Sequence, residues 1–382
     1  MKILFDFQAF SMQTHGGVSR CFAELVAELC SVGADCVLGV KESDNVYLQE
    51  KNLVTKLKPL GYRQNKWFGH KQYFHGENRL KRFVFDAVGY SVTPNPDYCI
   101  KLLKQQSFDV FHPTFFEPYF LDFLKEKPFV LTIHDMIPEL YPQYFDRDDS
   151  QIIWKQILAP KASAIVAVSE TTKKDIVRIL HVPEEKVFVV HHGCSMVSPA
   201  ESHRILKFPY VLYIGDRFGY KNFNRFITSV AVTLKRHKEL KIVCTGKPFK
   251  PSETEMFTSL GIDDKICHFW VNDNDELYSL YHYAECFVYP SDYEGFGIPI
   301  LEAYASDCPV LLHDASCFPE IAGDAAVYFS FDHCDLNEKL EYILSYSESQ
   351  RNDLLKKQRE RLSHYSWEKS AEQHIGIYRS LV

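Results

Sequence analysis

Short apolar runs alternate with amphipathic stretches through the first half of the chain. Apolar residues recur at positions 18, 21, 22, 25, 26 and 29, which is the spacing of one buried helical face. Ser169 stands directly before a second helical stretch and fits an N-cap position. The pattern predicts helices at residues 18–29 and 170–180 and strands at residues 3–7, 36–40, 108–111, 129–133, 164–168 and 187–190.

Residues 196–207 show little periodicity and are predicted to be a linker, after which a second alternating series begins. Strands separated by helices imply parallel sheets with right-handed crossovers, in which ligands bind beyond the carboxyl ends of the strands. A length of 382 residues suits two α/β domains of about 150–200 residues each. The second series predicts strands at residues 210–214, 241–244, 266–269, 286–289, 309–312 and 326–329 and helices at residues 222–235, 275–283, 299–305 and 337–346.

The composition argues against several classes of protein. A formal net charge of −7 argues against a nucleic-acid-binding protein, because such proteins present an excess of basic residues. No apolar run reaches the roughly 20 residues that span a bilayer, and residues 2–5 enter a strand without a signal-peptide pattern. The 11 cysteines include no Cys-x-x-Cys pair, which is typical of reduced thiols. These features predict a cytoplasmic protein.

The most informative stretch covers residues 294–302, with the sequence EGFGIPILE. An apolar run over residues 286–290 precedes it and Pro299 fits the first turn of a helix, so the order is strand, glycine loop, helix. Glycines let the backbone approach a ligand, and a helix start offers free N–H groups to phosphate. Glu294 on the loop and Glu302 inside the helix can accept hydrogen bonds from sugar hydroxyls. The stretch therefore predicts a site for a phosphate that carries a sugar at each end.

This string resembles the E-x7-E motif of retaining GT-B glycosyltransferases, and of glycosyltransferase family 4 in particular. The resemblance implies an α/β fold in which two Rossmann-like doubly wound domains face each other across a cleft. It implies an acceptor domain over residues 1–198, a nucleotide-sugar donor domain over residues 199–365, and a C-terminal helix over residues 366–382 that packs back on the first domain. Such an enzyme moves a sugar from a GDP- or UDP-sugar to a hydroxyl, with retention at the anomeric carbon and without a metal.

The resemblance also assigns roles within the motif. Glu294 would hold hydroxyls of the transferred sugar, and Glu302 would hold the ribose. The residues between them, Phe296, Gly297 and Ile298, are expected to contact the donor. The family's usual setting further implies work in cell-surface polysaccharide or glycolipid assembly.

Gly16 and Gly17 follow the first predicted strand and open a predicted helix, where free N–H groups favour a diphosphate. The pair resembles the N-terminal glycine loop of the family and is expected to contact the donor. The pattern is not Gly-x-Gly-x-x-Gly, and no acidic residue closes the second strand. This lowers the case for an NAD-dependent dehydrogenase.

Three further residues resemble family positions at the ends of strands. Arg217 and Lys221 follow the strand at residues 210–214, where the family supplies an Arg and a Lys to the donor diphosphate. Tyr220 stands where the family often has another Arg, so no third cation is expected there. His134 follows the strand at residues 129–133 and resembles the histidine that meets the transferred sugar or the acceptor. Fixed cations at a departing diphosphate are usually the largest catalytic contribution, and no residue is an obvious nucleophile.

Residues 269–281 resemble the segment that cups the nucleotide base, with backbone contacts expected around Trp270 and Val271. Asp273 or Asn274 also fits a helix N-cap. Two Asp-x-Asp pairs are interpreted as chance, and no carboxylate–histidine spacing supports a metal site. We therefore expect neither a metal nor a cofactor beyond the nucleotide-sugar donor.

Residues 51–82 contain nine Lys or Arg and a single acidic residue, Glu77, with interleaved aromatic residues. One interpretation is a solvated loop. The other is a surface for anionic lipid head groups, where each basic residue contributes about 1 kcal/mol. The second interpretation suits a lipid-linked saccharide acceptor and a peripheral position on the inner face of a membrane.

Two alternatives remain open from the sequence. A glycan phosphorylase or nucleotide-sugar hydrolase is compatible with the same scaffold. A nucleotide-sugar-binding subunit without turnover is a different class of protein. Loss of Lys221 or Glu294 would favour that class, and both residues are present.

Overall fold

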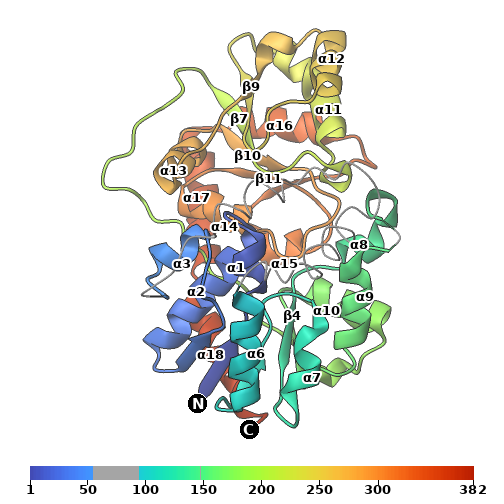
Figure 1. Ribbon diagram of the computed structural model, residues 1–382. Coiled ribbons are helices and arrows are strands. Elements are labelled where there is room, and N and C mark those ends of the chain that lie inside the picture. The colour runs from blue at the N-terminus through green and yellow to red at the C-terminus, as the bar shows by residue number, and fades with distance from the viewer. Residues whose placement is uncertain (55–93, 147) are drawn as a thin grey trace.

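The computed structural model describes residues 1–54, 94–146 and 148–382. Figure 1 shows two α/β domains, with the N-terminal domain in blue to green below and the C-terminal domain in yellow to orange above. From residue 55 onward, the basic segment 51–82 lies outside the described residues. Among the described residues, no helix is both long enough and apolar enough to cross a membrane.

The N-terminal domain is built on parallel strands in two adjoining sheets. Their orders are β2-β1-β3 and β4-β5-β6, and a parallel bridge between Phe111 and Phe129 connects their edges. The strands are β1 (Lys2–Phe5), β2 (Asp35–Leu38), β3 (Val110–His112), β4 (Val130–Ile133), β5 (Ala164–Ala167) and β6 (Val187–Val189). The helices are α1 (Gln8–Met12), α2 (Gly17–Ser31), α3 (Val46–Glu50), α6 (Asn95–Gln105), α7 (Leu121–Leu124), α8 (Ile137–Leu140), α9 (Ser150–Leu158) and α10 (Glu170–Leu180).

The C-terminal domain contains a six-stranded parallel sheet in the order β12-β11-β10-β7-β8-β9. The strand order reverses between β7 and β10, which is the arrangement of a Rossmann fold. The strands are β7 (Tyr210–Tyr213), β8 (Lys241–Cys244), β9 (Ile266–His268), β10 (Cys286–Tyr289), β11 (Val310–His313) and β12 (Val327–Phe329). Its helices are α11 (Phe223–Arg236), α12 (Pro251–Leu260), α13 (Asn274–His282), α14 (Ile298–Ala305), α15 (Phe318–Ala322), α16 (Leu336–Leu344) and α17 (Glu348–Leu362), and the chain continues into α18 (Trp367–Arg379).

The apolar runs form the strands because both faces of each sheet are covered by helices. All four residues of β7 and of β10 are buried. Ser169 caps α10 as predicted, and its side chain accepts a hydrogen bond from the backbone N–H of Thr172. No helix or strand lies between Val189 and Tyr210, a stretch that includes the predicted linker at residues 196–207.

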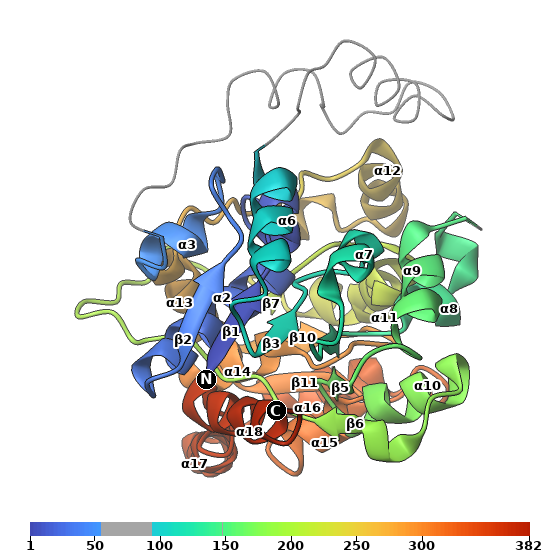
Figure 2. The ribbon, with the colours of Figure 1, turned by 60° about the horizontal axis from the view of Figure 1, so that its bottom comes forward.

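The last helix, α18, lies against α2 of the N-terminal domain. Trp367, Ala371 and Tyr378 are buried in the core of that domain. Figures 1 and 2 show this red helix beside the blue and green elements, after the chain has passed through the whole C-terminal domain. The two domains are thus connected both by the linker and by the return of the C-terminus.

Candidate active site

The switch point of the C-terminal sheet brings together two of the predicted site residues. Lys221 ends the 3-10 turn after β7, and Glu294 stands on the loop after β10. The Nζ atom of Lys221 lies 2.5 Å from Oε1 of Glu294, and their side chains are only 17% and 11% exposed. Ligands of doubly wound sheets bind beyond the carboxyl ends of the strands at such a switch point.

Asn222 holds Lys221 in place, although the sequence interpretation assigned it no role. Its backbone is in the left-handed region, with φ of 55°, which asparagine tolerates better than most residues. Its side-chain amide donates to the carbonyl of Pro290 and to Asp292, and the backbone N–H of Asp292 donates to the carbonyl of Tyr220. The loops after β7 and β10 are therefore tied together directly behind the Lys221–Glu294 pair.

Arg217 does not join Lys221 at this point, contrary to the sequence interpretation. Its guanidinium is paired with Glu253 on α12 at 2.9 Å, and the two side chains are 5% and 7% exposed. It also donates to the carbonyls of Lys247 and Pro248. These contacts hold Arg217 against the loop between β8 and α12, and its contact with a donor diphosphate stays a prediction.

Glu302 lies in the second turn of α14 and is paired across the domain boundary. The helix begins after Gly297, whose φ of +89° favours glycine, and a proline stands in its first turn as predicted. Oε1 of Glu302 accepts a hydrogen bond from Nη1 of Arg20 on α2 at 2.7 Å. Oε2 accepts one from the hydroxyl of Tyr281 at 3.3 Å. Arg20, which the motif analysis did not single out, therefore faces the E-x7-E helix.

Gly295 packs closely against the other domain, whereas the glycines of this loop were expected to let the backbone approach a ligand. A Cβ atom at Gly295 would lie 1.8 Å from the carbonyl oxygen of His134, which no side chain permits. The carbonyl of Gly295 accepts hydrogen bonds from the hydroxyls of Ser169 and Thr172 on the N-terminal domain. The loop that carries Glu294 is thus seated against the end of β4.

The start of α2 is open on the side of Gly17 and occupied on the side of Gly16. A Cβ atom at Gly17 would meet nothing within 4 Å, but one at Gly16 would collide with the side chain of Gln13. The Gln13 side-chain oxygen accepts a hydrogen bond from the backbone N–H of Ser19. One of the free N–H groups at this helix start is therefore satisfied by the protein itself.

The remaining predicted donor contacts lie mostly in packed positions. The Phe296 side chain is buried against His191, His192 and Tyr365, and its backbone carbonyl accepts a hydrogen bond from the thiol of Cys317. Ile298 is half-buried between the cores of the two domains. Two other residues are expected to contact the donor: Val271 is half-buried, and Trp270 is 62% exposed.

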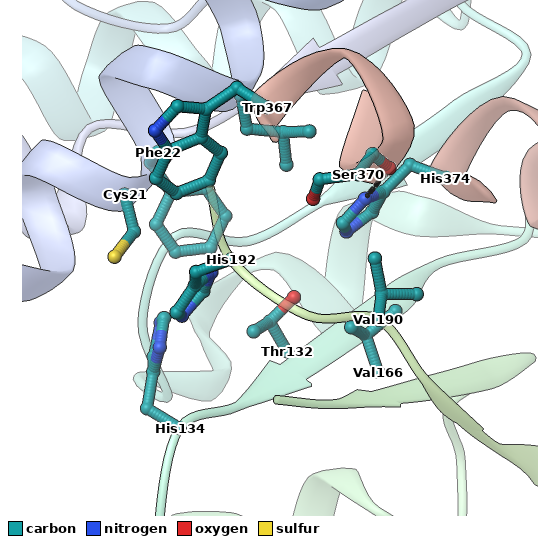
Figure 3. Close-up of a pocket in the computed structure, with 11 residues that line it drawn as sticks. Cys21, Phe22, Thr132, His134, Val166, Val190, His192, Trp367, Ser370 and His374 are labelled. Atoms are coloured by element: carbon teal, nitrogen blue, oxygen red, sulfur yellow. Dashed lines mark hydrogen bonds between the residues drawn. The ribbon is translucent and has the colours of Figure 1, made fainter. Parts of the chain in front are cut away.

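His134 stands at the end of β4 beside a small cavity of about 10 Å³, which is room for about one water molecule. Figure 3 shows the cavity wall, with Cys21 and Phe22 from α2 and with Trp367, Ser370 and His374 from α18. Nε2 of His134 is buried and has no hydrogen-bond partner among the described residues. Burial lowers its pKa to about 4, so the ring is neutral at pH 7.

The buried histidines should make the protein lose stability in weak acid. Burial lowers the pKa of His134 and of His374 to about 4, against an ordinary value of 6.5. Because the unfolded chain binds these protons first, stability is lost as the pH falls below 6.5 towards 4. At pH 5 each histidine should cost about 2 kcal/mol. Urea unfolding at pH 7.5 and pH 5 measures the loss. His374→Phe should reduce it, and an unchanged pH dependence in that variant would contradict the assignment.

One group in the described part of the chain has metal-ligand atoms in reach of one another. The side-chain ligand atoms of Cys21, His134 and His192 all lie within 4.8 Å of one another. Burial raises the pKa of the Cys21 thiol to about 12, which opposes formation of the thiolate that binds metals. The group contains no oxygen ligand of the kind that magnesium or manganese prefers.

Two family models match the chain, one on each domain. The model described as Glycosyltransferase Family 4 matches residues 15–196, and the model described as Glycosyl transferases group 1 matches residues 198–365. The boundary between them falls in the linker before β7. Each model thus contains one side of the contact between Arg20 and Glu302.

Similar proteins agree with these models. An O-antigen chain mannosyltransferase of Salmonella typhimurium is 30% identical over 202 residues, which are 53% of this chain and 56% of that protein. This match therefore spans about half of that relative. O-antigen chain mannosyltransferase B of Escherichia coli is 27% identical over 293 residues, which are 71% of this chain and 74% of that protein.

A crystal structure of HepE from Anabaena in complex with UDP and glucose superposes on the whole of both chains with a TM-score of 0.69 at 17% identity. At that identity the likeness concerns the fold alone, and it confirms the two facing Rossmann-like domains that the sequence predicted. The chain belongs to glycosyltransferase family 4 and has the GT-B fold.

Proposed function

We propose that this protein is a retaining, metal-independent glycosyltransferase that moves a sugar from a nucleoside diphosphate sugar to a hydroxyl of an acceptor. The observation that carries the proposal is the convergence of Lys221 and Glu294 at the β7–β10 switch point, 2.5 Å apart. Glu302 lies on the helix that follows the same loop. A cation for a diphosphate and two carboxylates for hydroxyl groups thus stand along one motif.

In this proposal each group has a distinct task. Lys221 and the start of α2 at Gly16 and Gly17 neutralise the diphosphate as it departs, because fixed charges and helix termini stabilise developing charge without reorganisation. Glu294 holds hydroxyls of the transferred sugar and Glu302 those of the ribose. Attack from the side of the leaving group, with the departing phosphate as base, needs no protein nucleophile.

His134 suits a role in positioning the transferred sugar. Its neutral ring has an Nε2 atom with no partner among the described residues, and such an atom can form a hydrogen bond with a hydroxyl group. A histidine with a pKa of about 4 is a poor proton carrier at pH 7, so we assign it orientation and no proton transfer. Arg217 acts as a positioning residue that fixes the loop before α12 through Glu253.

The names of the similar proteins support a more specific proposal for the donor and the acceptor. Two of them are O-antigen chain mannosyltransferases, and a protein of the same fold was solved with UDP and glucose. We propose that the donor is a GDP- or UDP-hexose and that the acceptor is a glycan or lipid-linked saccharide in surface polysaccharide assembly. We expect the backbone near Val271 and the exposed Trp270 to contact the base.

A thermal-shift screen tests the proposal. The free protein is heated with a panel of nucleoside diphosphates and their sugars, and each unfolding midpoint is compared with that of the protein alone. A ligand at 100 times its dissociation constant stabilises the folded state by about 2.7 kcal/mol. We expect the nucleotides of one base to raise the unfolding midpoint most and nicotinamide cofactors to leave it unchanged. Absence of a shift with every nucleotide would overturn the proposal. Binding without nucleotide-sugar consumption would favour a non-catalytic binding subunit.

Sugar transfer should survive treatment with EDTA to within about twofold. The one group of described residues whose metal-ligand atoms lie within reach of one another, Cys21, His134 and His192, contains no oxygen ligand of the kind that a magnesium ion prefers. Initial rates before and after chelation measure this. A Cys21→Ser variant serves as a control, because it removes the thiol of the Cys21–His134–His192 group. Complete loss of activity that magnesium or manganese restores would contradict metal independence.

Residues 51–82 should bind anionic membranes. The segment carries nine basic residues against one acidic residue although the whole chain has a charge of −7, so the attraction is local and acts within about 8–10 Å at physiological salt. Co-sedimentation with phosphatidylglycerol vesicles at low and high salt measures binding, with Lys66, Lys71, Lys81 and Arg82 changed to Ser as the matched variant. If the wild-type protein does not bind the vesicles at low salt, the segment is an ordinary solvated loop.

A further inference from the structure

Arg20 and Glu302 form a buried ion pair between the two domains. Arg20 is the fourth residue of α2, and its Nη1 atom lies 2.7 Å from Oε1 of Glu302 on α14. The two side chains are 15% and 6% exposed. Burial opposes the charge on Arg20, but the acidic groups around it, Glu302 first, together hold the pKa of the guanidinium above its ordinary value. A buried guanidinium and a buried carboxylate each need a partner.

Arg20 binds the carboxylate that the proposed function assigns to the ribose. Glu302 already accepts hydrogen bonds from Arg20 and from the Tyr281 hydroxyl. An ionised carboxylate accepts about four hydrogen bonds, so a ribose diol with two donors either shares the Glu302 oxygens with these groups or displaces one of them. Tyr281 is fully buried in the same domain as Glu302, whereas Arg20 reaches Glu302 from the other domain, so Arg20 is the donor that a ligand between the domains can displace.

A displaced Arg20 has a second partner within reach. It lies about one helical turn from Gly16 and Gly17, where the start of α2 is open on the Gly17 side. A diphosphate at that start would bring negative charge next to the released guanidinium. The planar fork of arginine matches phosphate oxygens in a bidentate manner.

We propose that Arg20 is an exchange cation for the donor. In the free protein it neutralises Glu302. When the donor binds, the ribose takes its place on Glu302 and Arg20 turns to the diphosphate at the start of α2. Every buried charge then keeps a partner in both states. This inference rests on the proposed function, because it requires a nucleoside diphosphate in the cleft.

The exchange predicts opposite effects of one substitution on two ligands. A nucleoside must break the Arg20–Glu302 pair and offers no phosphate in return, so Arg20→Ala should strengthen nucleoside binding by a few-fold. A nucleoside diphosphate gains the Arg20 contact, so the same change should weaken its binding by about tenfold or more, as loss of a charge-assisted hydrogen bond does.

The experiment titrates guanosine, uridine, GDP and UDP into the full-length wild type and its variants. Calorimetry covers the diphosphates, and ligand-observed NMR covers the weaker nucleosides. Arg236→Ala is the control, because it breaks an Arg–Glu pair between α11 and α16, with Glu341 at 2.8 Å, outside the proposed site. Arg20→Lys keeps the charge without the fork and should fall between wild type and Arg20→Ala for diphosphates. It also supplies the test if Arg20→Ala does not fold.

The possible results distinguish failure of the Arg20 exchange from failure of the proposed function. Opposite changes for nucleoside and diphosphate, absent from Arg236→Ala, support the exchange. Equal weakening of both ligands would overturn it and make Arg20 a support for Glu302 alone. Tighter binding of both ligands would mean that Arg20 only blocks the site. Unchanged binding of both ligands would mean that Arg20 takes no part in the site. If wild type binds neither diphosphate nor nucleoside, the proposed function itself fails, whatever the variants do.

Discussion

Replacing Lys221 with alanine should lower the rate of sugar transfer by about a hundredfold or more. Lys221 stands at the switch point of the C-terminal sheet, where the proposed function places the leaving diphosphate, and Asn222 holds it there through Pro290 and Asp292. Loss of one preorganised contact of this kind typically costs a factor of 10² to 10³. The measurement is the initial rate of nucleoside diphosphate release from the donor sugar.

Two further variants separate this catalytic effect from a loss of folding. Lys221→Ala leaves Glu294 buried without its cation, which destabilises the loop. Adding Glu294→Gln removes that orphaned charge and should restore stability without restoring the rate. Lys221→Arg keeps a cation and should retain more activity than the alanine variant. Rates of Lys221→Ala within threefold of wild type would contradict the role of this lysine.

Replacing Glu302 with alanine should weaken the binding of the nucleoside diphosphate by about tenfold or more. A ribose held by a buried carboxylate contributes to binding in the ground state and in the transition state alike, so affinity falls along with turnover. Glu302 is 4% exposed and accepts hydrogen bonds on both oxygens, from Arg20 and from Tyr281. Calorimetry with GDP and UDP measures the loss.

Inorganic pyrophosphate is the matched ligand for Glu302. It carries the diphosphate charge without a ribose, so its affinity should not fall when Glu302 is removed. Glu302→Gln keeps the size of the side chain and should lose less affinity for the nucleoside diphosphate than the alanine variant. An unchanged affinity of Glu302→Ala for the nucleoside diphosphate would reduce Glu302 to a structural residue of α14.

Local patterns predicted most of the fold. The predicted strand at residues 286–289 and the helix at residues 170–180 coincide with β10 and α10, because an apolar run and a capped amphipathic stretch each identify one element. Helix α17 has no such signal. Only Leu354, Leu355 and Gln358 are buried along it, which leaves too narrow an apolar stripe to recognise in the sequence.

The site could be predicted only as far as its motifs are contiguous. Glu294 and Lys221 follow strands that the pattern identified, so their meeting at the switch point follows from the sheet order. The partners of Arg217 and Arg20 do not follow, because they depend on contacts across 36 and 282 residues of sequence. The role of Gly295 was also out of reach, since only the packing of two domains brings His134 against it.

A crystal structure of the protein with a bound nucleoside diphosphate would show where the ribose and the diphosphate bind. We expect the ribose on Glu302 and the diphosphate between Lys221 and the start of α2 at Gly17. We also expect the 2.7 Å contact between Arg20 and Glu302 to be broken. A nucleotide bound away from the β7–β10 switch point, with both the Lys221–Glu294 and the Arg20–Glu302 pairs intact, would contradict the proposed site.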